Sequence, residues 1–316
     1  MTSKAAQGLA REGVRIARLG ALWRFTRPHT VIGTTASILG LYVICVEALP
    51  GVGLVDGASD LAWTLVAGFC VNVYIVGLNQ LEDVEIDRVN KPFLPLAAGE
   101  LTTAQARRIV AACAVIPCVL ALTQGAIESL AVLTGLAVGT AYSSPPMRLK
   151  RYPLLACLCI TGVRSIVVNL GVALHFTRAL TDAAWTIPGP VWALTLFALP
   201  FSLAIAILKD VPDAEGDRRF SIATFTLRLG AERVMRLALC ALTAAYAGMA
   251  IAGPLLLDDC HPAVLAATHV AVLATLWRMS ARTDAHDRAS FTAFYMGVWK
   301  LFFLEYTLVP LAVVLG

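Results

Sequence analysis

Long apolar stretches separated by short polar segments make up most of this chain. Each stretch is about as long as a helix must be to cross the hydrocarbon core of a bilayer, roughly 17–25 residues. Nine of them follow one another, at residues 30–49, 61–82, 107–124, 127–143, 153–174, 191–209, 234–253, 262–279 and 292–314. Because a soluble core could hold one or two such segments but not nine in succession, the pattern predicts an all-α polytopic membrane protein.

Composition and charge agree with this prediction. The chain is 58% hydrophobic and 15% charged, which is far from the roughly 25% charged residues of soluble domains. With nine spans, the segments on the side of the N-terminus are 1–29, 83–106, 144–152, 210–233 and 280–291. These segments and their flanks hold most of the Lys and Arg, whereas the opposite loops offer Arg178 alone. The asymmetry predicts that the N-terminal side faces the cytoplasm. The net charge of +4 thus reflects topology and gives no sign of nucleic-acid binding.

Residues 1–28 contain no apolar signal-peptide core. Arg11, Arg15 and Arg18 recur at helical spacing, while apolar residues such as Trp23 fall largely elsewhere around the helix. We expect an amphipathic segment lying on the cytoplasmic leaflet, attached to a single domain that spans residues 1–316.

Acidic residues form two matching clusters. Asn79, Asp83 and Asp87 follow the second apolar stretch at intervals of four, so that one face of a continuous helix would carry them all. Asp213 and Asp217 repeat the last two positions after the sixth stretch. The repeat suggests two related four-helix units followed by a ninth helix.

Carboxylates at these positions need compensation. Near a helix C-terminus each is disfavoured by roughly 0.3–1 kcal/mol, and the clustered charges also repel one another. A divalent cation would supply the missing positive charge, and Mg²⁺ typically binds one or two carboxylates together with substrate phosphates. The alternative is that the acids are ordinary charges of cytoplasmic loops.

Basic residues accompany the acids. Arg88 and Lys91 follow the first cluster, Lys209 precedes the second, and Arg148 and Lys150 lie in the loop between the fourth and fifth stretches. A diphosphate binds well where metal holds some of its oxygens and Arg or Lys the others. The alternative is that these residues only set the topology.

These motifs resemble the UbiA superfamily of intramembrane prenyltransferases. The resemblance rests on Asn79-x3-Asp83-x3-Asp87, on Tyr142-Ser143 with Pro145-Pro146-x-Arg148-x-Lys150-Arg151, and on Lys209-Asp210-x2-Asp213-x3-Asp217. Four further segments are similar to the homogentisate prenyltransferase branch: Arg27-Pro28-His29-Thr30, the run Asn90 to Ala97, Val168-Asn169-Leu170-Gly171 and Trp299-Lys300-Leu301-Phe302. The resemblance implies a nine-helix bundle around a central cavity, with Mg²⁺, a prenyl diphosphate and an aromatic acceptor such as homogentisate.

The resemblance also implies roles for individual residues. The metal ligands would be Asn79, Asp83, Asp87, Asp213 and Asp217. Lys209 and Tyr142 would join the four aspartates as catalytic groups. The residues expected to contact the substrates are Asn79, Arg88, Lys91, Ser143, Arg148, Lys150, Asp210, Arg27, His29, Asn169 and Lys300.

Two cations fall within predicted spans, where charged residues normally face a cavity or a partner. They are Arg164 in the fifth span and Lys300 in the ninth, and each is a candidate for a direct role in the site. Lys300 precedes Glu305 by five residues and could instead be neutralised by it.

The expected chemistry is loss of diphosphate to give an allylic carbocation, which an electron-rich ring then attacks. A terpene cyclase on the same scaffold is the main alternative, because an internal alkene could quench the same cation. A transporter with intramembrane charges explains poorly why both acidic clusters lie on one face. A bacterial cytoplasmic membrane is the expected location, with the lipid bilayer as partner and the site on its cytoplasmic side.

Overall fold

The computed structural model describes residues 15–181 and 185–316. Within these residues, nine helices are long and apolar enough to cross a bilayer, which confirms the predicted number of spans. The spans are Pro28–Glu47 (α2), Ala58–Glu82 (α3), Thr103–Gln124 (α5), Ala126–Ser143 (α6), Pro153–Thr181 (α7, η2 and α8), Gly189–Leu208 (α9), Ala231–Leu256 (α12), Pro262–Ala281 (α13) and Arg288–Val314 (α14). The all-α fold is therefore confirmed as well.

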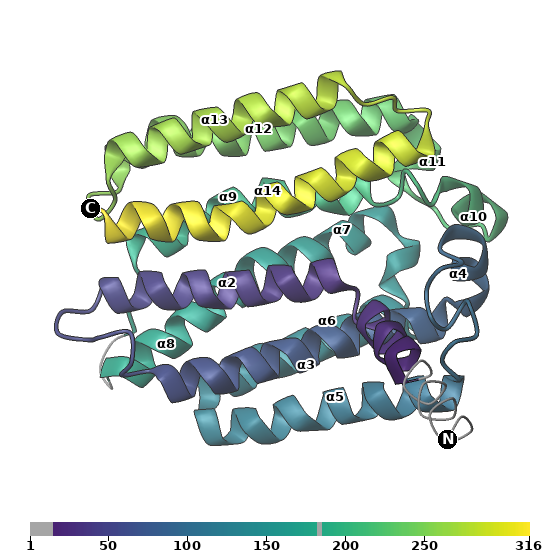
Figure 1. The fold of residues 1–316 in the computed structure, drawn as a ribbon, viewed down its shortest axis with the longest axis horizontal. Helices are drawn as coiled ribbons and strands as arrows, with labels where there is room; N and C mark the ends of the chain where they lie inside the picture. Colours follow the sequence, from purple (N-terminus) through teal and green to yellow (C-terminus); the bar gives the residue numbers. More distant parts are fainter. Residues whose placement is uncertain (1–14, 182–184) are drawn as a thin grey trace, which may run out of the picture.

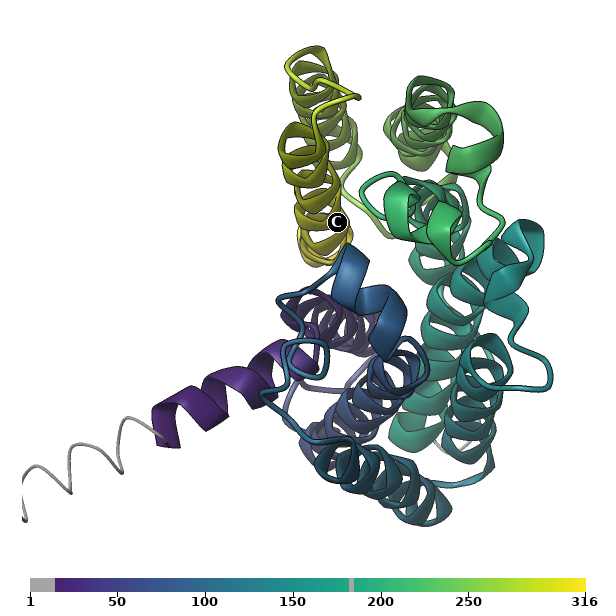
Figure 2. The ribbon, with the colours of Figure 1, turned by 90° about the vertical axis from the view of Figure 1, so that its right-hand side faces the viewer.

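The nine spans run side by side in one bundle (Figure 1). In the first half of the chain α3 packs against α5 and α6, and in the second half α12 packs against α9 and α13. The first and last spans, α2 and α14, lie against each other and join the two halves. Viewed from the end that carries the short helices, the spans surround a central region (Figure 2).

Short helices collect at one end of the bundle (Figure 1). They are Val84–Asn90 (α4), Leu149–Arg151 (η1), Ala214–Arg219 (α10) and Phe225–Leu229 (α11). α4 and α10 contact each other although they come from different halves of the chain. The same local structure thus recurs at both acidic clusters, since a short helix starts directly after Asp83 and again directly after Asp213.

The expectation of one continuous helix through the first acidic cluster was wrong. α3 ends at Glu82, and Asp83 has φ −116° and ψ 18°, outside the helical range. Asp87 therefore lies in the first turn of α4, and Asp217 lies in the first turn of α10. The argument from helix C-termini consequently fails for these two acids, because the N-terminal end of a helix favours negative charge.

Residues 15–25 form a helix that points away from the bundle at the same end (Figure 2). Phe25 is buried, and its backbone carbonyl accepts a hydrogen bond of 2.8 Å from the Gln80 side chain. Ile16, Leu19 and Trp23 remain exposed. Exposed apolar residues beside the bundle are typical of a helix that lies in the membrane interface. The interfacial position of this helix stays a prediction. Arg11 lies outside the described residues.

Candidate active site

A cavity of about 1300 Å³ occupies the middle of the bundle. Residues of α2, α3, α6, η2, α9 and α14 line it, together with α4 and α10 at the end that carries the acidic clusters. α5, α12 and α13 pack outside it. Deeper in the bundle the wall becomes largely apolar, with residues such as Ile75, Val163 and Val168. A polar entrance above an apolar interior suits a substrate with a charged head and a hydrocarbon tail.

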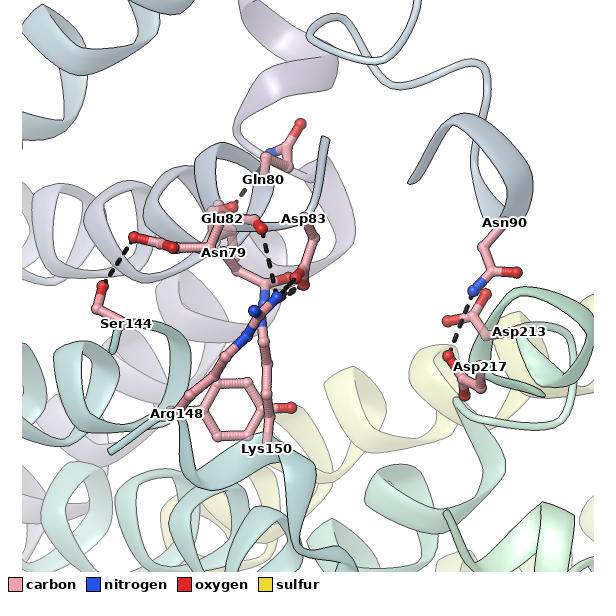
Figure 3. A network of polar contacts seen from close by, with 12 residues as sticks. Asn79, Gln80, Glu82, Asp83, Asn90, Ser144, Arg148, Lys150, Asp213 and Asp217 are labelled. Carbon is pink, nitrogen blue, oxygen red and sulfur yellow. Dashed lines mark hydrogen bonds and ion pairs between the residues drawn. The ribbon is translucent and has the colours of Figure 1, made fainter. Parts of the chain in front are cut away.

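Asp83 is the centre of the first acidic cluster (Figure 3). Arg148 donates to its Oδ1 at 2.9 Å, and Lys150 donates to its Oδ2 at 2.5 Å. The amide of Asn79 also donates to Oδ2, at 3.1 Å. The loop after α6 thus brings two cations to a carboxylate at the end of α3, as the paired basic and acidic motifs predicted.

The second cluster has the same composition on the opposite side of the cavity. Lys91, which follows α4, forms an ion pair with Asp213 at the start of α10. Lys209, at the end of α9, lies 3.7 Å from Asp210 and donates to the Tyr142 hydroxyl at 2.7 Å. All five residues line the cavity. Each cluster therefore combines carboxylates with cations from a different part of the chain.

Asn90 joins the two clusters and was not expected to do so. Its amide nitrogen donates to Asp217 at 3.3 Å (Figure 3). Its oxygen accepts from the backbone N–H of Gly216 at 2.9 Å. Gly216 allows this contact, because a Cβ at that position would collide with the Asn90 side chain. Arg288 of α14 in turn donates to the Asn90 carbonyl at 2.5 Å. The position of Asn90 beside Lys91 in a motif segment was the only signal in the sequence.

Burial raises the pKa of Asp87 and Asp217, the carboxylates of the two motifs for which no ion pair is described. It raises the pKa of Asp87 to about 6, although the nearby Arg27 and Lys91 oppose the effect. Burial, reinforced by Asp210 and Asp213, raises the pKa of Asp217 to about 7. Asp87 Oδ2 is buried and has no hydrogen-bond partner. A cation bound beside Asp87 and Asp217 would therefore stabilise their ionised forms.

Arg27 and His29 also reach the cavity, from the start of α2. Arg27 has a left-handed backbone conformation with φ 51°, which is uncommon outside glycine, and its Nε is buried without a partner. The ring of His29 lies 5.0 Å from that of Trp299, edge to face. Both side chains therefore lie where a substrate in the cavity could contact them, and their roles as substrate contacts stay predictions.

Five residues that were expected to contact substrate do not line the cavity. Arg88 is exposed and pairs with Glu85 at 2.6 Å. Ser143 is fully buried outside the cavity wall. Asn169 accepts a hydrogen bond of 2.8 Å from Tyr306, so it holds two helices together. Arg88 and Asn169 thus bind other side chains of the protein, and Ser143 is enclosed by its neighbours.

Lys300 is the fourth, and its placement in the site was wrong. Its side chain is exposed on the outer surface of α14, whereas Trp299 and Phe302 turn inward. The alternative partner was also wrong, because Glu305 pairs with His269 of α13 at 2.9 Å, with both side chains fully buried. Arg148 likewise lies behind the wall, but it acts on the site through Asp83.

The donor set fits magnesium. No group of three or more His, Cys, Asp or Glu side chains comes together as a ready-made metal cage anywhere in residues 15–181 and 185–316. Mg²⁺ does not require one, since it usually binds one or two carboxylates and takes its other ligands from water and phosphate. Oxygen ligands from Asp and Asn, and the unpartnered Oδ2 of Asp87, are of the kind it prefers.

Comparison with known proteins decides the family. Residues 37–304 match the UbiA prenyltransferase family. The chain belongs to this family. This protein is thus a membrane-embedded prenyltransferase, and the resemblance of its motifs is confirmed.

Several curated UbiA relatives are similar over nearly the whole chain. Homogentisate phytyltransferase of Synechocystis sp. is 48% identical, with 94% of this chain and 96% of the relative covered. Homogentisate phytyltransferase 1 of Arabidopsis thaliana is 38% identical, with 92% and 75% covered. Homogentisate solanesyltransferase of the same plant is 35% identical, with 94% and 78% covered.

Solved UbiA structures share the fold. The structure of a UbiA homolog from Archaeoglobus fulgidus bound to GPP and Mg²⁺ superposes with a TM-score of 0.62 at 17% identity, covering 92% of this chain and 99% of that one. A structure of digeranylgeranylglyceryl phosphate synthase also gives 0.62, at 18% identity, with 95% and 98% covered. At this identity the comparison establishes that the fold is shared.

Proposed function

We propose that this prenyltransferase transfers a prenyl group from a prenyl diphosphate to homogentisate or a related hydroxylated aromatic acid, with Mg²⁺ as cofactor. The observation that carries the proposal is the pair of acidic clusters, each with its own lysines, on opposite sides of one cavity mouth. The names of the relatives, which include two phytyltransferases and a solanesyltransferase of homogentisate, support the choice of acceptor.

The residues that would hold Mg²⁺ are Asn79, Asp83, Asp87, Asp213 and Asp217. When bound, the metal would neutralise charge that develops on the diphosphate as it leaves. Lys91, Lys150 and Lys209 face the same space and would donate hydrogen bonds to the remaining phosphate oxygens. In this arrangement the carboxylates fix the position of the head group and the lysines stabilise the leaving group.

The bond-forming steps require that the cavity keep water away from the reacting carbon. The allylic C–O bond breaks, the diphosphate takes the bonding electrons, and a carbon of the acceptor ring attacks the allylic carbon. The ring then loses a proton and becomes aromatic again. Because water would quench the carbocation, the apolar wall beyond the clusters serves to keep water from the reacting carbon. The prenyl tail would lie along the same wall.

Transfer is better supported than cyclisation. A cyclase needs a closed apolar cavity and no contacts for a second polar substrate. Here Arg164, His29 and Arg27 all line the cavity, and the curated relatives named above are transferases. These polar side chains are potential hydrogen-bond donors to the carboxylate of an aromatic acid.

The proposal is tested by incubating the purified protein in lipid nanodiscs with Mg²⁺ and one prenyl diphosphate at a time, from geranyl to solanesyl. Homogentisate is supplied together with a panel of other phenolic acids, and product masses are read by mass spectrometry. We expect an adduct of prenyl group and acceptor that disappears with EDTA. A cyclic hydrocarbon formed without acceptor would contradict the proposal.

A further inference from the structure

Arg164 occupies an unusual place in the bundle. It lies in η2 (Gly162–Gly171), a π-helical segment in the middle of the fifth span. π-helical turns inside α-helices are rare and frequent at functional sites. The guanidinium carbon of Arg164 lies 4.5 Å from the ring centre of Trp299 and 5.7 Å from that of Phe302, both on α14. Arg164 and both rings line the central cavity.

This guanidinium has no anion. Its Nη1 is buried and makes no hydrogen bond, and it forms no ion pair with any carboxylate in the described part of the chain. The three cavity lysines differ, since Lys91, Lys150 and Lys209 each lie beside an aspartate. An unpaired cation at membrane depth is costly, and such residues normally face a ligand.

A second donor without an acceptor lies beside it. The indole Nε1 of Trp299 is buried without a hydrogen-bond partner. The ring of His29 lies against Trp299, with 5.0 Å between the ring centres. Arg164, Trp299 and His29 therefore offer N–H groups and aromatic surfaces, which is the chemistry that receives an aromatic anion.

Depth separates this place from the diphosphate site. Arg164 comes 11 residues after Pro153, where its span begins, and Trp299 comes 11 residues after Arg288, whose side chain bonds to Asn90. At about 1.5 Å per residue, both lie about 16 Å into the bundle. A diphosphate bound between the two acidic clusters would not reach Arg164, but a second substrate placed below the reacting carbon would.

We propose that Arg164 binds the carboxylate of the aromatic acceptor and that Trp299 and His29 flank the acceptor ring. This proposal rests on the proposed function and names the acceptor subsite within it. A guanidinium stacked on an indole keeps its donor edge free, and that edge matches the two oxygens of a carboxylate. The contact would anchor the far end of the acceptor, so that its ring points toward the acidic clusters.

The test compares two acceptors that differ by one carboxylate. Homogentisate and methylhydroquinone carry the same dihydroxylated ring, and a methyl group in the second replaces the acetate side chain of the first. The variants are Arg164→Met and Arg164→Lys. Arg178→Met is the matched control, because Arg178 also lies over an indole, that of Trp185, at 4.8 Å but does not line the cavity.

We expect Arg164→Met to lower kcat/KM for homogentisate about 10- to 100-fold, the range for loss of a charged hydrogen bond, mainly through a higher KM. Its kcat/KM for methylhydroquinone and its KM for prenyl diphosphate should stay near those of the wild type. Arg164→Lys should recover part of the loss, and Arg178→Met should cause none. Equal losses with both acceptors, or no loss with homogentisate, would overturn the assignment.

Binding without turnover separates this inference from the proposed function. Homogentisate is titrated calorimetrically into wild-type protein that carries Mg²⁺ and a non-reactive prenyl thiodiphosphate. Binding that is lost in Arg164→Met but kept in Arg178→Met supports the subsite even if no product forms. Wild-type binding that Arg164→Met retains would reject it, whatever the reaction proves to be.

Discussion

Asn90 and Asp217 are hydrogen-bonded at 3.3 Å although 127 positions separate them in the chain. The bond connects α4, which follows the first acidic cluster, with α10, which follows the second. Asn90 also accepts from the backbone of Gly216, so two bonds hold one short helix against the other. An uncharged side chain thus links the two short helices, alongside the ion pair of Lys91 and Asp213.

Breaking this connection should impair the site more than the fold. We expect Asn90→Ala to weaken metal-dependent binding of prenyl diphosphate about 10- to 100-fold, the range for residues that orient metal ligands. Gly216→Ala should have the same effect, because its Cβ would displace the Asn90 side chain. Gly248→Ala, whose Cβ meets nothing within 4 Å, is the control. Equal binding in all three variants, measured by calorimetry, would contradict this role.

The acidic clusters themselves can be tested with neutral isosteres. Asp83→Asn and Asp213→Asn should each lower kcat/KM roughly 10²–10³-fold, as expected when charge stabilisation in the transition state is lost. Asparagine is preferable to alanine at position 83, since it keeps the size of the side chain and one acceptor oxygen, although Arg148 and Lys150 bind different oxygens of Asp83. Glu85→Gln is the control, because its exposed carboxylate pairs only with Arg88. Activity near wild type in Asp83→Asn or Asp213→Asn would remove that residue from the site.

The stability of the metal-free protein should depend on pH through Asp217. Its pKa is about 7 in the folded protein, mainly because of burial, against an ordinary value of 3.8. The folded state thus binds more protons than the unfolded state between these values, so this group lowers stability as pH rises from about 4 to about 7. Asp217→Asn removes the effect. Melting temperatures in EDTA between pH 5 and pH 8 should fall less steeply for this variant, and parallel curves would contradict the prediction.

Much of this architecture was predictable from the sequence, because a membrane span must satisfy simple requirements of length and polarity. The break at Asp83 was not, since neither Gly nor Pro marks it and the spacing of four suits a continuous helix. In the structure Asp83 pairs with Arg148 and Lys150, two cations from a distant loop. Local patterns carry no information about such contacts.

Lys300 illustrates a second limit. α14 is apolar nearly all around, so its sequence does not show which face meets lipid and which meets the cavity. Trp299 turns inward, and the next residue, about 100° further around the helix, turns outward.

Topology can be tested by labelling single cysteines in a background without the eight native ones. Cysteines at Glu85 and Arg218 should react with an impermeant reagent from the cytoplasmic side, because both residues are exposed at the end that holds α4 and α10. A cysteine at Val55, which is exposed in the loop between α2 and α3, should react only from the other side. Labelling of positions 85 and 218 from opposite sides would be incompatible with one shared site.

The buried pair of His269 and Glu305 should matter for stability alone. α13 lies outside the cavity wall, and the pair is fully enclosed. Removing one member, as in His269→Leu, leaves a buried carboxylate without its partner and should cost about 3–5 kcal/mol. The double variant His269→Leu with Glu305→Leu should regain much of that loss. Thermal unfolding in detergent measures both effects, and a double variant no more stable than the single one would contradict the pairing.

The contact between α2 and α14 has a consequence for biosynthesis. These are the first and last spans to leave the ribosome, and the cavity wall needs both of them. A nascent chain that already carries both acidic clusters still lacks the part of the cavity wall that α14 supplies, including Trp299 and Phe302. The pocket for the reacting carbon is therefore complete only after α14 has been inserted beside α2.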